Sequence, residues 1–92
     1  MDRIIVPLDG SPLAEQALET ARYLAQTLQG SLVLAHVVES PPVPGVAEAD
    51  REDAERYLAA VAQAIAADGA VPVATRVLLG PVAETLLALA RE

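Results

Sequence analysis

The chain contains no cysteine, lysine, phenylalanine or tryptophan, and it has a single histidine. Without cysteine, disulfides and thiolate metal sites are excluded. No apolar run approaches the roughly 20 residues that a membrane span requires, and the N-terminus lacks the basic and apolar regions of a signal peptide. We therefore expect a cytoplasmic protein without a membrane partner.

The charge balance is acidic, with a formal net charge of −7. Such a balance disfavours nucleic acid and anionic membranes, because both would repel the chain. The 92 residues predict one domain spanning residues 1–92. Hydrophobic residues make up 53% of the chain and alanine dominates them. This is more apolar surface than one small domain can cover, which suggests a partner chain.

Three apolar runs predict buried strands at residues 3–8, 31–38 and 71–79. Each is followed by a segment in which apolar residues recur at helical spacing. The expected buried faces consist of Leu13, Ala17, Ala21, Leu24 and Leu28 in the first helix, Ala54, Leu58, Val61 and Ile65 in the second, and Val82, Leu86 and Leu89 in the third.

Capping residues set the expected helix boundaries. Ser11 is the expected N-cap of the first helix, Pro12 suits its first position and Gly30 is expected to end it. A proline-rich connector follows the second strand at 39–45, where helix and central strand are disfavoured. The second helix is expected to begin between Val46 and Arg51 and to stop at Asp68-Gly69. Gly80-Pro81 is expected to open the third helix.

The alternation of strands and helices predicts an α/β fold with a three-stranded parallel sheet and crossover helices. Right-handed crossovers give the strand order 3-2-1, with the first two helices on one face. The opposite face then has only the third helix to cover it, and the first strand has a free edge. A buried-type strand such as Ile4-Ile5-Val6 should not be left facing water at that edge.

Asp9 follows the first strand, at the end of the sheet where ligands of open α/β folds bind. Its carboxylate could accept a hydrogen bond from a ribose hydroxyl, or it could bond the backbone amides of the turn; the two roles are compatible. Ser11 could help to receive an anion at the helix N-terminus. We interpret it as a plain cap, because Pro12 removes one donor and no cationic residue stands close in sequence.

The remaining polar residues suggest no catalytic or metal site. His36 is the only histidine, and we expect it to pack in its strand beneath a helix, because it has neither a spaced nucleophile nor enough companion ligands. An acidic cluster at the start of the second helix is interpreted as a solvated face favoured by the helix dipole. Its members are Asp50, Glu52, Asp53 and Glu55. We therefore expect no enzyme activity.

Three segments resemble the universal stress protein family: residues 3–11 (RIIVPLDGS), 34–38 (LAHVV) and 76–84 (RVLLGPVAE). The resemblance covers essentially the whole chain and implies a Rossmann-like fold similar to the N-terminal part of adenine nucleotide alpha hydrolases. The family domain is longer, with two further strands, and its ATP-binding members carry a glycine loop after the fourth strand. This sequence resembles a shortened form, since that loop and the last two strands are lacking.

The resemblance implies an adenine and ribose half-site made of Pro7, Leu8, Asp9 and Val38. Our main hypothesis is a non-enzymatic stress-family module without competent ATP binding. We expect it to form a homodimer or higher oligomer through the first-strand edge or the uncovered sheet face. The alternative is a stress-response protein that binds ATP through the retained half-site.

Overall fold

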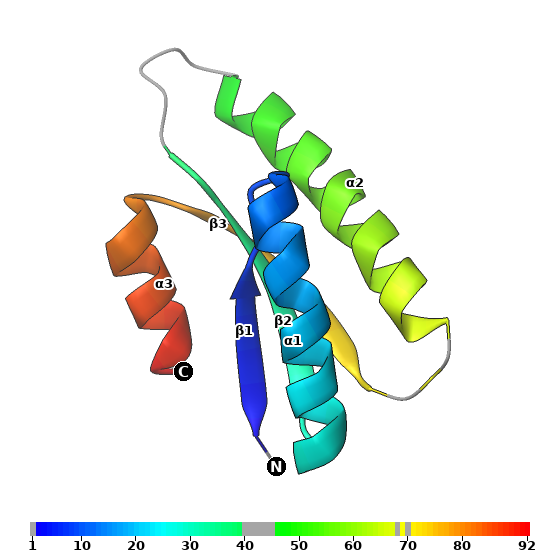
Figure 1. Cartoon of the computed structure of the whole chain (residues 1–92). Coiled ribbons are helices and arrows are strands. Elements are labelled where there is room, and N and C mark those ends of the chain that lie inside the picture. Colours follow the sequence, from blue (N-terminus) through cyan, green and yellow to red (C-terminus); the bar gives the residue numbers. More distant parts are fainter. Residues whose placement is uncertain (1, 40–45, 68, 70) are drawn as a thin grey trace.

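The structure is a computed structural model that describes residues 2–39, 46–67, 69 and 71–92. Its elements alternate in the order β1 (Arg3–Pro7), α1 (Pro12–Leu28), β2 (Ser31–Val38), α2 (Val46–Ala66), β3 (Val73–Leu79) and α3 (Val82–Ala90). The predicted alternation is therefore confirmed (Figure 1). The connector from residue 40 to 45 and Asp68 lie outside the described residues. No helix in the described part of the chain is long and apolar enough to cross a membrane.

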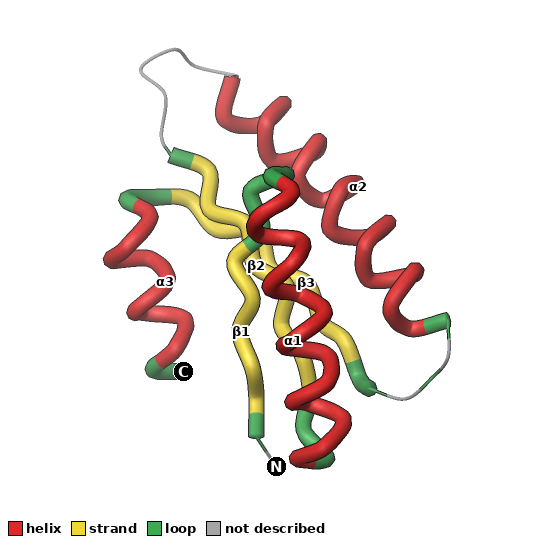
Figure 2. The backbone as a smooth tube through the Cα atoms, in the orientation of Figure 1, coloured by secondary structure: helices red, strands yellow, loops and turns green. Residues whose placement is uncertain are grey.

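The strands form one three-stranded parallel sheet in the order β1-β2-β3, which is the predicted order read from the other edge. Val6 of β1 lies opposite Leu34 of β2, and Ala35 of β2 lies opposite Arg76 of β3. α1 and α2 cover one face of the sheet and α3 lies on the other (Figure 2). The arrangement of helices predicted from right-handed crossovers is thus confirmed.

β2 supplies the core of both layers, because successive side chains of a strand point to opposite faces. Leu32 and Leu34 are fully buried beneath α1 and α2, in a cluster completed by Val6 and Leu58. Val33 and Ala35 point to the other face, where they meet Leu89 of α3. The α3 layer is the smaller of the two, as expected for a face that has one helix over it.

The buried face of α1 differs from the predicted one. Leu18, Ala21 and Ala25 are buried against the sheet. Of the expected stripe only Ala21 points inward: Leu13 is 77%, Leu24 44% and Leu28 51% exposed, and Ala17 is exposed as well. The sequence carries two overlapping apolar stripes on this helix, and the one that is buried holds fewer leucines than the predicted one.

The turn after α1 also corrects a prediction. Gln29, not Gly30, takes the left-handed conformation that ends the helix, with φ 54°. The Gly30 N–H donates to the Ala25 carbonyl at 2.8 Å. Gly30 is buried, and a Cβ built on it would stand 2.2 Å from the Asp2 carbonyl oxygen. Glycine is therefore required here for close packing against the start of β1 and not for backbone freedom.

Several element ends differ in detail from the sequence prediction. β1 ends at Pro7, one residue early, and β3 begins at Val73, two residues late. Val82, expected on the buried face of α3, is 42% exposed. Arg3 ties the C-terminal end of α3 to β1, because its guanidinium donates to the Leu89 carbonyl at 3.0 Å.

These corrections lead to opposite predictions for two adjacent residues. Gly30→Ala should destabilise the protein by about 1–3 kcal/mol, because the methyl group collides with backbone. Gln29→Gly should stabilise it by about 0.5–1 kcal/mol, because glycine adopts the left-handed conformation without a Cβ penalty. Urea unfolding at a fixed protein concentration measures both changes. The control Gln26→Gly, inside the exposed helix, should cost about 1 kcal/mol; a loss of stability in Gln29→Gly would contradict this description of the turn.

Candidate functional site

The turn between β1 and α1 places Asp9 at the carboxyl end of the sheet. The Asp9 carboxylate accepts a hydrogen bond from the Ser11 N–H at 2.9 Å. The Ser11 hydroxyl accepts one from the Ala14 N–H at 3.2 Å, so Ser11 is the N-cap that the sequence predicts. Gly10 has φ +86°, a conformation that favours glycine. The turn role of Asp9 is therefore established by geometry, while its carboxylate stays exposed.

The ionised form of Asp9 is stabilised by its neighbours. The Ser11 hydroxyl, followed by the Ser11 N–H, lowers the pKa of Asp9 below its ordinary value of 3.8. The charge of His36 acts in the same direction. A lowered pKa means that the carboxylate contributes stability above pH 3.8, and that this contribution is lost as the pH falls through the folded pKa.

His36 bridges the ends of the first two strands. Its Nδ1 lies 2.7 Å from the Leu8 carbonyl oxygen. Because a carbonyl only accepts, Nδ1 must carry the proton and donate. The side chain is half-buried and borders a cavity, rather than being packed beneath a helix as expected. Its structural role is nevertheless clear, since the bond fixes the end of β1 to β2.

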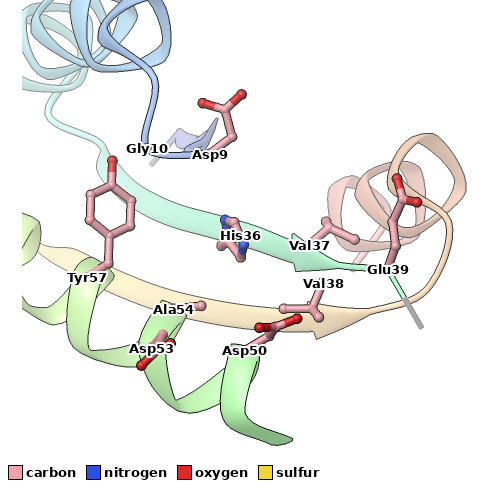
Figure 3. A pocket seen from close by; sticks show the side chains of 10 residues that line it. All are labelled: Asp9, Gly10, His36, Val37, Val38, Glu39, Asp50, Asp53, Ala54 and Tyr57. Carbon is pink, nitrogen blue, oxygen red and sulfur yellow. The ribbon is translucent and has the colours of Figure 1, made fainter. Parts of the chain in front are cut away.

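A cavity of about 490 Å³ opens between the ends of β1 and β2 and the first half of α2. This volume is in the range of small-molecule sites. Figure 3 shows the residues around it. Its lining consists of Asp9, Gly10, His36, Val37, Val38, Glu39, Asp50, Asp53, Ala54 and Tyr57. Asp9 and Val38, two of the four predicted half-site residues, thus border the same cavity.

Pro7 and Leu8, the other two predicted residues, border a second hollow of about 240 Å³. This hollow lies on the β1 side, where Ala14 of α1 and Val82 of α3 also line it. Asp9 borders both hollows, so it stands between them. Leu8 is only 2% exposed, whereas the Pro7 ring is accessible. The structure therefore divides the predicted half-site across two adjoining spaces.

Tyr57 of α2 extends toward the β1–α1 turn across the large cavity. Figure 3 shows its hydroxyl directed at Gly10. The oxygen is buried and completes no hydrogen bond with the described residues. Burial raises the pKa of Tyr57, and the charge of Glu15 on α1 adds to the rise, although the Gly10 amide partly offsets it. The neutral hydroxyl is thus a buried polar group beside the β1–α1 turn.

The walls of the large cavity are acidic. Four carboxylates line it, from Asp9, Glu39, Asp50 and Asp53, and the lining contains no arginine. Asp53 pairs with the exposed Arg56 on the outer side of α2. The acidic cluster of α2 is otherwise exposed, as expected, with Glu55 bonded to Arg51 at 3.3 Å. The described residues hold no group of three or more side chains suited to a metal ion.

Sequence reasoning missed the contribution of α2 to this site. Asp50, Ala54 and Tyr57 recur at intervals of four and three, which places them on one face of a helix. That spacing was available in the sequence. The sequence does not show how this face of α2 packs beside β2. That packing places Tyr57 next to the turn that follows β1.

The carboxylate of Asp9 provides a test of the turn geometry. Ser11→Ala removes the hydroxyl that most lowers the pKa of Asp9, so that pKa should rise toward 3.8. The Asp9 side-chain carbon signal, followed by NMR from pH 2 to 6, measures it. The control Ser11→Thr keeps a hydroxyl and should retain the lowered pKa. An unchanged pKa in Ser11→Ala would show that the hydroxyl does not hold the carboxylate.

The comparisons with known proteins agree on one family. The sequence model of the universal stress protein family matches residues 1–92. A solved structure of a universal stress protein family member from Burkholderia pseudomallei is 35% identical, with a TM-score of 0.82 over 97% of this chain and 72% of the other. Universal stress protein UspA from Lactobacillus plantarum is 24% identical, with a TM-score of 0.83 over 97% and 68%.

A third structure, a universal stress protein in complex with cAMP, has a TM-score of 0.79 at 20% identity, over 98% of this chain and 68% of the other. At 24% and 20% identity, the last two structures bear on the fold alone. No curated protein matches significantly. The family match over residues 1–92, with the same fold in each solved relative, shows that the chain belongs to the universal stress protein family.

Proposed function

We propose that this chain is a non-enzymatic universal stress protein module that self-associates and does not bind ATP tightly. One observation carries the self-association. β1 is an apolar strand, yet within the described residues it has a neighbouring strand on one side only. An unpaired apolar strand edge is a ready template for another chain.

The direction of the backbone groups shows what the edge offers. The Ser31 N–H donates to the Asp2 carbonyl and the Leu8 N–H donates to the Ala35 carbonyl, both at 2.8 Å. Even-numbered residues of β1 therefore turn their backbone groups to β2. By alternation, the N–H and C=O of Arg3 and Ile5 and the C=O of Pro7 point to the open edge. These groups support pairing with a further strand.

The acidic cavity supports the absence of tight ATP binding. A triphosphate near the four carboxylates would meet repulsion in a chain of net charge −7. His36 is the one basic side chain in the lining, and its Nδ1 is engaged by the Leu8 carbonyl. The same lining provides no nucleophile beside a base, which supports a non-enzymatic role.

Self-association leads to a direct prediction. The protein at micromolar concentration should have the mass of a dimer or a higher oligomer by light scattering, because association covers the edge of β1 that is open within the described residues. Dilution should shift the mass downward by mass action. A well-folded monomer throughout the micromolar range would contradict the proposal.

A second candidate function is weak adenine nucleotide binding, favoured by the meeting of Asp9 and Val38 at one cavity of about 490 Å³. In that case the adenine would lie near Val38 and a ribose hydroxyl would donate to the Asp9 carboxylate. Without groups that hold the phosphates, the affinity would be roughly millimolar, or about −4 kcal/mol.

Calorimetry with ATP separates the two functions. We expect no binding tighter than about 100 µM, since that would need roughly −5.5 kcal/mol from a site with repulsive walls. Adenosine, which lacks phosphates, should bind no more weakly than ATP. Binding of ATP or adenosine at roughly millimolar affinity that is abolished by Asp9→Ala and retained in the control Asp2→Ala would favour the second candidate. ATP binding below 100 µM would contradict the first proposal.

A further inference from the structure

We infer that two copies of the chain join by antiparallel pairing of β1 with β1 about a two-fold axis beside Ile5, with α1 packing against α1 over the junction. This inference rests on the proposed self-association and specifies its geometry. A two-fold pairing of identical strands is antiparallel, and the axis normal to the sheet keeps both α1 helices on the same face. The result is one continuous six-stranded sheet.

The outward backbone groups of β1 select the register. With Ile5 on the axis, the two Ile5 residues exchange both of their N–H···O=C bonds. Each Arg3 N–H then meets the Pro7 carbonyl of the second copy. A register centred on Pro7 offers no N–H donor at its centre, because proline lacks one. A register centred on Arg3 would carry Pro7 past the start of the partner strand. The Ile5 register therefore satisfies the most outward groups.

The charges are complementary in the same register. Arg3 lies opposite Pro7 of the second copy, and Asp9 lies two residues further along that strand. Long side chains bridge such diagonal positions in antiparallel sheets. Each arginine, whose guanidinium also donates to the Leu89 carbonyl of its own chain, is thus brought near an exposed carboxylate whose lowered pKa keeps it ionised. The attraction occurs twice, which offsets part of the repulsion expected between two acidic chains.

One flank of α1 is apolar and faces the open edge of β1. This apolar flank consists of Leu13, Ala17, Leu24 and Leu28. Helical geometry places these side chains on one flank and Glu15 on the opposite one. Glu15 acts on Tyr57 of α2, so its flank is turned toward α2 and the apolar flank is turned away from it. Figure 1 shows β1 between α1 and α3, with α2 beyond α1. No charged residue interrupts the apolar flank.

The spacing of strands and helices allows the flanks to meet. α1 packs on β1 and β2. Strands are about 4.8 Å apart, so a helix over the β1–β2 boundary lies about 5 Å from the axis and about 10 Å from its copy. That distance is typical of packed helices. α1 runs antiparallel to β1, from the Asp9 turn to Gly30 beside Asp2, so its middle is near the level of Ile5.

The flank is complementary to itself when the two helices run antiparallel. With the axis between residues 20 and 21, Leu13 lies opposite Leu28 of the second copy and Ala17 lies opposite Leu24. Large residues thus meet across the ends, while a small residue meets a large one near the middle. The side chains that α1 leaves in water, among them Leu13 at 77% exposure, become the packing of the junction.

Single-cysteine variants test the register, since the chain has no cysteine of its own. Ile5→Cys should form a disulfide-linked dimer on mild oxidation, because Cα atoms of directly paired residues are about 5.5 Å apart. The control Pro7→Cys should stay uncrosslinked, because its copy lies about 13 Å away. In parallel, Leu24→Glu should raise the dimer dissociation constant about tenfold or more, while Gln26→Glu, with the same charge off the flank, should change it less than twofold.

The outcomes separate this inference from the self-association itself. Cross-linking of Ile5→Cys with weakening by Leu24→Glu, in variants whose circular dichroism is native, supports the geometry. An oligomer that Ile5→Cys does not cross-link, or that Leu24→Glu leaves unchanged, overturns the geometry and leaves the proposed self-association standing. A monomeric parent protein overturns both.

Discussion

The structure depends on the hydrogen-bonded ladder of β2. Among the described residues it is the strand with neighbours on both sides, and its side chains belong to both apolar layers. Leu32 and Leu34 anchor α1 and α2, whereas Val33 and Ala35 anchor α3. Because β2 takes the centre of the sheet, β1 and β3 are its two edges within the described residues. An apolar strand is thereby placed where its outward backbone groups face water, and the proposed association follows from that placement.

The order of elements could be predicted from the sequence because each apolar run and each helical repeat is local. The crossover rule then fixed the sheet order and the faces that the helices cover. The inward face of α1 could not be predicted in this way. Two apolar stripes run along this helix, and leucine content favours the wrong one. The choice depends on how the helix packs against β1 and β2, which the spacing within one helix does not encode.

The end of α1 illustrates the same limit. Glycine after a helix usually supplies a left-handed cap. Here Gly30 is needed because the Asp2 carbonyl leaves no room for a side chain, so Gln29 takes the strained position. At the site, Asp9 was predicted from its place at a strand end and Val38 from the family resemblance, and the structure brings them to one cavity. Tyr57 was missed because it arrives from α2, whose packing is a tertiary property.

The central claim is that the outward groups of β1 are paired when the chain associates, and amide hydrogen exchange of single residues tests it most directly. The Ile4 and Val6 amides face β2 and should be protected at every protein concentration. The Ile5 amide should be protected at high concentration and lose that protection on dilution, with the Arg3 amide following it. An Ile5 amide that exchanges as fast as an exposed loop amide at all concentrations, in an otherwise protected sheet, would contradict the account.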